Sequence, residues 1–148
     1  MYEKILIATD GSKFAKTAVS HGIELAQHVG AKVVVMTVTQ GWTAYQMAEK
    51  IQKGDANPIS DYVASMEELA GQILDDAKKV AEAANVSCKV VHVSNGHPAE
   101  GIIETADKET CDLIVMASHG RRGLDRMLLG SQTAEVLGFS KIPVLVLR

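Results

Sequence analysis

The segment of this sequence best suited to chemistry is a glycine- and arginine-rich stretch at residues 117–131. It follows an apolar run, passes glycines at positions 120, 123 and 130, and ends in Gly130-Ser131-Gln132-Thr133, which is typical of a helix start. A helix N-terminus offers unpaired N–H groups and partial positive charge, and glycines let the backbone approach an anion closely. Ser131 and Thr133 are expected to add hydroxyl donors. The pattern predicts a phosphate-binding loop.

The charge of this stretch supports the same hypothesis. Three arginines (121, 122 and 126) against Asp125 give it a net charge of +2, whereas the chain carries −3 and therefore −5 elsewhere. A basic loop in an acidic protein indicates a small phosphorylated ligand rather than nucleic acid. Taken singly, Gly123 and Arg126 are better interpreted as a turn residue and a solvated side chain. The whole arrangement favours phosphate.

Five apolar, β-rich runs alternate with helical patterns and must position this loop. The runs at 4–9, 32–38, 88–93, 112–117 and 142–147 are apolar at nearly every position, as in strands covered on both faces of a parallel sheet. Helices are expected after Ser12, over 60–84, from Pro98, and from Gly130-Ser131. Residues 39–58 form a long connection, with a short helix expected around 44–52.

These elements predict an α/β fold, a doubly wound, open five-stranded parallel sheet with helices on both faces. Polar, glycine-containing loops follow the first run (9–12) and the fourth (118–123). Ligands bind such sheets where the strand order reverses, and strands one and four are neighbours in the order 3-2-1-4-5 but not in 2-1-3-4-5. We therefore predict the order 3-2-1-4-5.

Two of the helical patterns predict buried faces. The first helix is expected to bury Ala15, Ala18, Gly22, Ala26 and Val29, and the second Val63, Met66, Ala70, Ile73, Ala77, Val80 and Ala84. The last helix carries Ala134, Val136 and Leu137.

Composition narrows the class of protein. A chain of 148 residues that is 47% hydrophobic predicts one domain, residues 1–148, with a sizeable core. Only 4% of the residues are aromatic, which argues against stacking on nucleic acid. No apolar stretch approaches a membrane span, and the acidic start does not resemble a signal peptide, so a cytoplasmic location is expected. Cys88 and Cys111 form no CxxC pair and are expected to be buried hydrophobes, and the histidines form no zinc motif.

The spacing of the loop resembles the nucleotide-binding members of the universal stress protein family. Their motif, G-x2-G-x9-G-(S/T), is matched by Gly120 and Gly130-Ser131, with Ala117 in place of the first glycine. The segments 4–12, 97–100 and 142–146 also resemble signatures of the family. The likeness covers the chain apart from residues 39–58, and implies a Rossmann-like fold of the adenine-nucleotide alpha-hydrolase type.

The resemblance implies a site for ATP or AMP, where Mg²⁺ could accompany ATP and contact Asp10. The strand-one end would hold adenine and ribose, Val38 would add an apolar contact, Met116 and Ala117 would line the base pocket, and the loop and helix start would hold the phosphates. The implied binding residues are Ala8, Thr9, Asp10, Val38, Met116, Ala117, His119, Gly120, Arg121, Gly130, Ser131, Gln132 and Thr133. Gly130→Val is expected to block phosphate contact without unfolding the domain.

Three hypotheses about function remain open. The chain could be a stress-response regulator controlled by its nucleotide, a slow ATPase or phosphotransferase using the same pocket, or a protective interaction protein that binds no nucleotide. Dinucleotide-binding, P-loop, phospho-receiver and serine-hydrolase patterns are absent, and no catalytic residue is assigned. The last strand, 142–147, is expected to pair across a two-fold axis in a homodimer, as the family implies, which would cover an exposed sheet edge.

Overall fold

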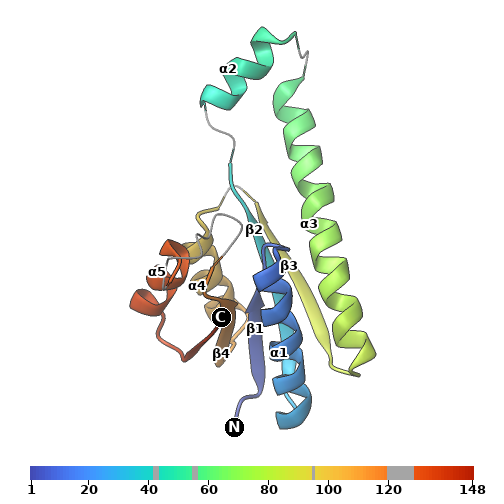
Figure 1. Cartoon of the computed structure of the whole chain (residues 1–148), viewed down its shortest axis with the longest axis vertical. Helices are drawn as coiled ribbons and strands as arrows, with labels where there is room; N and C mark the ends of the chain where they lie inside the picture. Colours follow the sequence, from blue (N-terminus) through green and yellow to red (C-terminus); the bar gives the residue numbers. More distant parts are fainter. Residues whose placement is uncertain (42–43, 55–56, 95, 120–128) are drawn as a thin grey trace.

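The central sheet has the predicted number and order of strands. The structure, a computed structural model, describes residues 1–41, 44–54, 57–94, 96–119 and 129–148. Within them the strands are β1 (Lys4–Ala8), β2 (Lys32–Thr39), β3 (Cys88–Ser94), β4 (Leu113–Ala117) and β5 (Val144–Leu147). All neighbours pair in parallel, in the order β3-β2-β1-β4-β5 (Figure 1). The predicted order 3-2-1-4-5 is confirmed.

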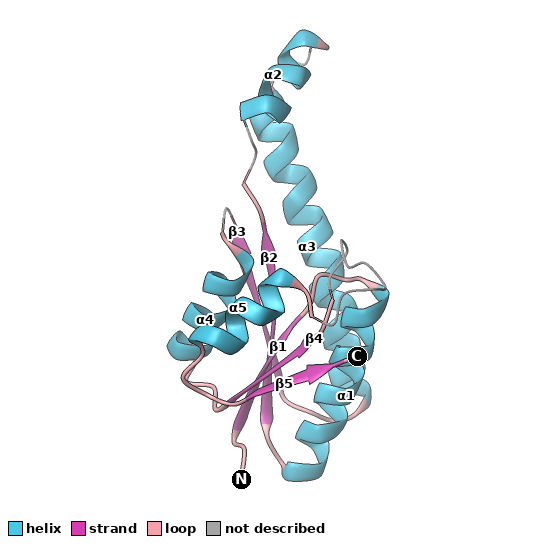
Figure 2. Cartoon of the chain, turned by 60° about the vertical axis from the view of Figure 1, so that its left-hand side comes forward, coloured by secondary structure: helices cyan, strands magenta, loops and turns pink. Residues whose placement is uncertain are grey.

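Helices cover both faces of the sheet. The structure places α1 (Lys13–Val29) and α3 (Pro58–Ala83) on one face, and α4 (Pro98–Lys108) and α5 (Ser131–Phe139) on the other (Figure 2). The expected short helix in the long connection is present as α2 (Ala44–Gln52). Figure 1 shows that α2 and the first turns of α3 project beyond the sheet. Among the described segments, no helix has the length and apolarity needed to cross a bilayer.

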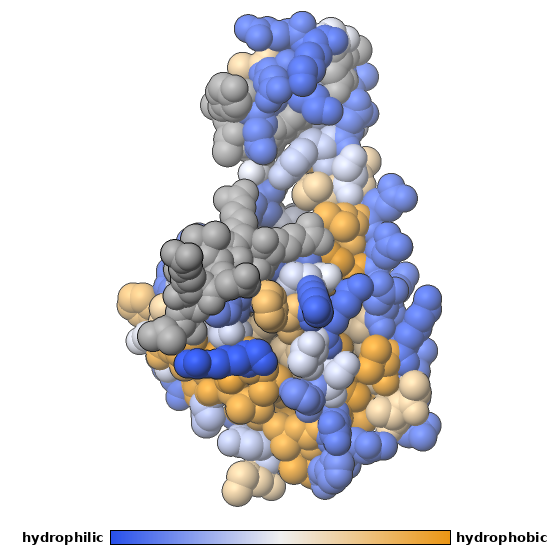
Figure 3. All heavy atoms as spheres, viewed as in Figure 1, coloured by the Kyte–Doolittle hydropathy of each residue, from blue (hydrophilic) through white to orange (hydrophobic). Residues whose placement is uncertain are grey.

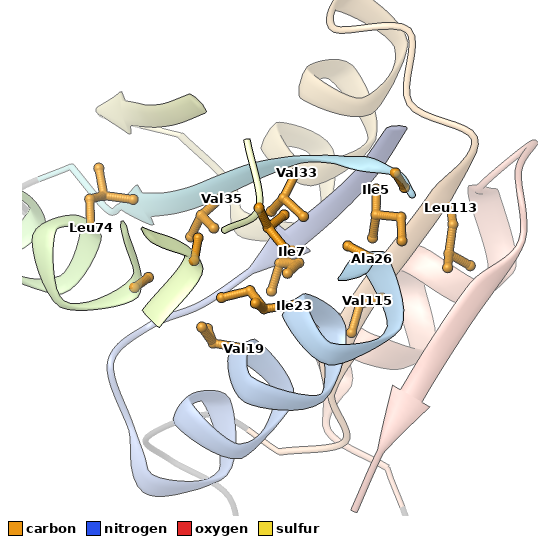
Figure 4. Packing of buried hydrophobic residues seen from close by; sticks show 14 residues of the cluster. Ile5, Ile7, Val19, Ile23, Ala26, Val33, Val35, Leu74, Leu113 and Val115 are labelled. Atoms are coloured by element: carbon orange, nitrogen blue, oxygen red, sulfur yellow. The ribbon is translucent and has the colours of Figure 1, made fainter. Parts of the chain in front are cut away.

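Alternation along the strands produces two apolar layers. Ile5, Ile7, Val33, Val35 and Val115 face α1 and α3, and Figure 4 shows this cluster. The intervening strand residues face α4 and α5: Leu6, Ala8, Val34, Met36, Ile114 and Met116. Because successive strand residues point to opposite faces, every side chain can be assigned to one of the two faces by its position.

The start and the packing of α1 have clear local causes. The Ser12 side chain accepts the Ala15 N–H, and the helix ends at Gly30 in the left-handed region, at φ 71°. Gly22 lies against the sheet: a Cβ there would approach Ile7 Cδ1 to 2.6 Å. The short side chain at position 22 therefore permits close contact between α1 and β1.

Several predicted helix faces are wrong at their margins. Val29, Val63, Val80 and Leu137 are 38–43% exposed. In α3, Ala70 and Ala77 are buried as predicted, and the other buried residues are Leu74 and Ala81 in place of Ile73 and Val80. Positions 70, 74, 77 and 81 follow the helical repeat over the sheet, whereas the first turns of α3 extend past it and have no sheet to pack on. Val29 is the last residue of α1, where the chain turns away.

Strand ends differ from the prediction by at most two residues, with identifiable reasons. β4 begins at Leu113; just before it, Asp112 donates its N–H to the Lys4 carbonyl while its carboxylate accepts the N–H groups of Glu3 and Lys4. β5 begins at Val144, after Pro143, which has no N–H to donate. Both cysteines are free: Cys111 is buried as expected, whereas Cys88 is only half-buried.

Candidate functional site

A cavity of about 570 Å³ opens at the carboxyl ends of β1, β2 and β4. Its volume is within the range of about 300–1,000 Å³ typical of small-molecule sites. All of the predicted binding residues that the structure describes line it: Ala8, Thr9, Asp10, Val38, Met116, Ala117, His119, Gly130, Ser131, Gln132 and Thr133. Gly120 and Arg121, also predicted, lie outside the described residues, as do Arg122, Gly123, Asp125 and Arg126.

The β1 side of the cavity is a turn held by its own side chains. Thr9 donates its N–H to the Met36 carbonyl at 2.9 Å, which extends the β1–β2 pairing by one bond. Its hydroxyl oxygen accepts the Gly11 N–H at 3.2 Å, and one carboxylate oxygen of Asp10 accepts the Ser12 N–H at 2.9 Å. Gly11 has a φ of 76°, which favours glycine. The turn fixes Asp10 at the cavity rim just before α1.

The β4 side is connected to α5 through backbone bonds. Gly130 donates its N–H to the Ser118 carbonyl at 2.7 Å, and the Thr133 hydroxyl donates to the Ala117 carbonyl at 3.0 Å. A hydroxyl has only one hydrogen, so the expectation that Thr133 adds a hydroxyl donor for phosphate does not fit this geometry. Thr133 instead holds the start of α5 against the end of β4.

Gly130 lies closer to its neighbours than the sequence indicates. A Cβ at this position would lie 3.0 Å from the Ser118 carbonyl oxygen, a backbone atom that already accepts the Gly130 N–H. Gly130→Val would therefore push apart the β4–α5 connection itself. The expectation that this substitution affects phosphate contact alone is not supported, and a binding test needs another position.

Among the described residues, the N-terminus of α5 is the feature of the cavity wall best suited to an anion. Gly130 occupies the N-cap and no side chain caps the helix. The next three residues, Ser131, Gln132 and Thr133, line the cavity, and Ser131 is exposed. The first turn contains no acidic side chain that would repel an anion. Backbone N–H groups without intrahelical partners are therefore available at this wall.

The side chain of Gln132 already forms a hydrogen bond to the neighbouring helix, α4. Its Oε1 accepts the Ala99 N–H at the start of α4, at 3.0 Å. One turn further along α5, Glu135 contacts His97 Nε2 at 3.0 Å. These bonds fix α5 relative to α4. Gln132 would therefore donate to a ligand through its backbone N–H and not through its side chain.

His119 lies where β4 meets the start of α1. Its Nδ1 is 2.8 Å from the Ser118 hydroxyl, and its ring lies 6.0 Å from the Phe14 ring, centroid to centroid. The imidazole therefore has a fixed position at the cavity wall. Among the described residues, no three metal-ligating side chains cluster, and Asp10 is the one carboxylate in the described cavity lining.

One wall of the cavity comes from α3, which the sequence pattern did not predict as part of the site. Tyr62, Met66, Leu69 and Ile73 of α3 line it, at spacings of four, three and four residues. Thr37, Thr39 and Gln40 add the end of β2, and Pro98 and Ile102 add the start of α4. The α3 spacing was visible in the sequence as a helical stripe, but it was assigned to the core.

Comparisons with known proteins bear on the family and the fold of this chain. The model of the universal stress protein family matches residues 1–148. Universal stress protein MJ0531 of Methanocaldococcus jannaschii is 34% identical over 148 residues, covering 100% of this chain and 83% of that protein.

Two solved structures extend the comparison. The structure of MJ0577, a universal stress protein of the same organism, superposes with a TM-score of 0.80 at 31% identity, covering 99% of this chain and 96% of that one. A universal stress protein in complex with cAMP has a TM-score of 0.70 at 27% identity, covering 99% and 97%. With a family match over every residue and relatives above 30% identity along the full length, this chain belongs to the universal stress protein family.

Proposed function

We propose that the chain binds an adenine nucleotide, ATP or AMP, in the cavity at the carboxyl ends of β1, β2 and β4. The observation that carries the proposal is the convergence of three segments far apart in sequence: the end of β1, the end of β2, and the β4–α5 connection all line one cavity. The related universal stress protein in complex with cAMP supports the adenine-nucleotide class.

The phosphates are assigned to the wall formed by α5. The N–H groups of Ser131, Gln132 and Thr133 and the exposed Ser131 hydroxyl supply donors there, and the helix dipole adds positive potential. Gly120 and Arg121 belong to the proposed phosphate set from the sequence motif, outside the described residues. His119 borders the same region.

The ribose and the base are assigned to the strand ends. Asp10 at the β1 rim suits a ribose hydroxyl, because one of its oxygens orients the turn and the carboxylate lies at the cavity wall. Ala8, Thr9, Val38, Met116 and Ala117 provide a mainly apolar surface for the base. When ATP carries Mg²⁺, the phosphates would supply most of the ligands of the ion. Asp10 is the one carboxylate among the described cavity residues that could supply a further ligand.

The bound nucleotide is proposed to control the formation of a homodimer through β5. β5 is an edge strand, and Leu145 on it is 37% exposed, so pairing with a second copy would satisfy its backbone. Ser118 connects that edge to the phosphate wall: its N–H bonds to the Leu147 carbonyl and its carbonyl accepts the Gly130 N–H, each at 2.7 Å. A ligand that shifts the start of α5 would therefore act on β5 through one residue.

The direct test is calorimetry with ATP, AMP and GTP, followed by sedimentation with and without ligand. We expect saturable binding of ATP or AMP, weaker binding of GTP, and a dimer at micromolar concentration. No heat, and no displacement of a fluorescent ATP analogue, at millimolar ATP would overturn the nucleotide proposal. Phosphate release in the same samples separates a binder from a slow ATPase, and a monomer at all concentrations would overturn the dimer.

A further inference from the structure

The helix whose start forms the proposed phosphate wall, α5, is held by few buried side chains. Only Thr133 and Val136 of α5 are buried, whereas the neighbouring α4 buries five residues. The Thr133 hydroxyl donates to the Ala117 carbonyl and the Gly130 N–H to the Ser118 carbonyl, so both bonds tie α5 to the end of β4. A short helix with so little buried surface depends strongly on its polar contacts for its position.

Two side chains of α5 make further polar contacts with the start of α4, which lies beside it (Figure 2). Gln132 and Glu135 are three residues apart, so they lie on the same side of the helix. Gln132 Oε1 accepts the Ala99 N–H at 3.0 Å, and the Glu135 carboxylate accepts a hydrogen bond from His97 Nε2, also at 3.0 Å. These two bonds, Gln132 to Ala99 and Glu135 to His97, are called the α4–α5 clamp below.

The clamp also compensates the N-terminus of α4. His97 occupies the N-cap of α4, but its side chain caps no N–H group of that helix. The Ala99 N–H, in the first turn, has no partner within α4, and Gln132 supplies the acceptor. Both helices begin at the cavity, since Pro98 of α4 and the first turn of α5 line it, so two partly positive helix ends lie close together. The Gln132 oxygen and the Glu135 carboxylate offset the repulsion between these ends.

We infer that the side chains of Gln132, Glu135 and His97 are positioning residues for phosphate: the α4–α5 clamp sets the position of the first turn of α5 and thereby the affinity for the phosphates of the nucleotide. The inference rests on the proposed nucleotide binding and goes beyond it, because Glu135 and His97 do not line the cavity. A clamp that holds the backbone N–H groups of α5 in place raises the fraction of molecules ready to bind phosphate. Apparent affinity is proportional to that fraction.

The charge of Glu135 separates positioning from electrostatics by sign. A carboxylate one turn into α5 repels a phosphate bound at the start of that helix, so its removal would strengthen ATP binding if charge alone mattered. Loss of the clamp should weaken ATP binding instead. Glu104 of α4 is exposed and takes no part in the clamp, so it provides a matched control for the loss of one negative charge.

The test measures the affinities for ATP and adenosine by calorimetry in Glu135→Ala, Glu135→Gln and Glu104→Ala. The pair of Glu135 and His97 is partly exposed, and its loss predicts that Glu135→Ala binds ATP about threefold more weakly and adenosine unchanged. Glutamine at position 135 keeps an oxygen that can accept from His97 and removes the charge, so Glu135→Gln should bind ATP at least as tightly as the unsubstituted chain. Glu104→Ala should not weaken either ligand.

Gln132→Leu tests the other bond of the clamp, and its loss predicts ATP binding about fivefold weaker with adenosine unchanged. The melting temperature of each ligand-free variant shows that it is folded during the titration. Unchanged or tighter ATP binding in Glu135→Ala or in Gln132→Leu would overturn the inference and leave nucleotide binding intact. An equal loss for adenosine would also overturn it, because the clamp would then support the fold alone. If the unsubstituted chain binds neither ligand, the proposed function fails and this inference with it.

Discussion

Ser131→Asp should separate phosphate binding from folding, because its effects on the two have opposite signs. Ser131 is the first residue of α5, its side chain is exposed, and it makes no contact on which the core depends. A carboxylate in the first turn of a helix is favourable to the helix dipole, by about 0.3–1 kcal/mol. The folded, ligand-free protein should therefore become slightly more stable.

The effect on affinity follows from the charge placed beside the phosphates. A carboxylate on Ser131 would lie about 5–6 Å from a phosphate held by the same helix turn, and at an exposed site an effective dielectric constant of about 40 gives about 1.5 kcal/mol of repulsion for each charge pair. That repulsion weakens ATP binding about tenfold. AMP, with fewer charges, should lose less, and adenosine should lose nothing.

Calorimetry at low ionic strength, with Ser131→Asn as the matched neutral control, measures this difference. The ratio of dissociation constants between the Asp and Asn variants isolates the charge, since the two side chains have nearly the same shape. The ratio should shrink as salt is added, because the Debye length falls to about 10 Å at 0.1 M. Equal ATP affinity in the two variants, or an equal loss for adenosine, would refute the placement of phosphates at α5.

Three further predictions concern the scaffold. Gly22→Ala should destabilise the protein by up to about 2 kcal/mol, because its Cβ would overlap Ile7. Gly71→Ala, at an open position inside α3, should stabilise it by about 1 kcal/mol. Chemical denaturation measures both changes, and equal effects would contradict the close packing of α1. Burial raises the pKa of the Cys111 thiol to about 11 from the usual 9. The contribution of this thiol to the free energy of unfolding is therefore fully present below pH 9 and is lost as the pH rises through 11. Iodoacetamide at pH 8 should modify Cys111 only after unfolding, and rapid labelling of Cys111 in the folded protein would contradict this. Gln132→Leu should lower stability by about 1 kcal/mol through loss of the bond to the α4 N-terminus, and an unchanged melting temperature would show that this bond contributes nothing.

The strands and their order could be predicted because the signals are local and strong. Apolar runs such as 32–38 are covered on both faces, and the polar loops after β1 and β4 identify the neighbouring strands at the reversal point. The same loops gave the cavity residues of β1, β4 and α5, since the carboxyl ends of parallel strands meet at one edge of the sheet. The helix start at Ser131 followed from the Gly130-Ser131 pair, in which Gly130 occupies the N-cap.

The α3 wall could not be predicted in this way, because periodicity shows that a helix has an apolar stripe but not what the stripe meets. Met66 and Ile73 fit a core helix as well as a cavity wall. The distinction depends on where the sheet stops relative to the helix, and α3 is longer than the strands beside it. Figure 3 shows the consequence: a mainly hydrophilic tip above a body in which apolar surface gathers.

The sequence of β2 nevertheless indicates where the core ends and the cavity begins. Its row facing α1 and α3 reads Val33, Val35, Thr37, Thr39, so a methyl is replaced by a hydroxyl at the point where the apolar layer gives way to the cavity. Thr39 has a partner, His92 Nε2 at 2.8 Å, and Thr37 has none that the structure describes. Among the described residues no buried side-chain oxygen or nitrogen lacks a partner, so the Thr37 hydroxyl is accommodated because it borders the open cavity and not the packed core. A strand that continued into the core would keep valine at positions 37 and 39, so the change to threonine marks the level at which packed side chains on β2 give way to the cavity.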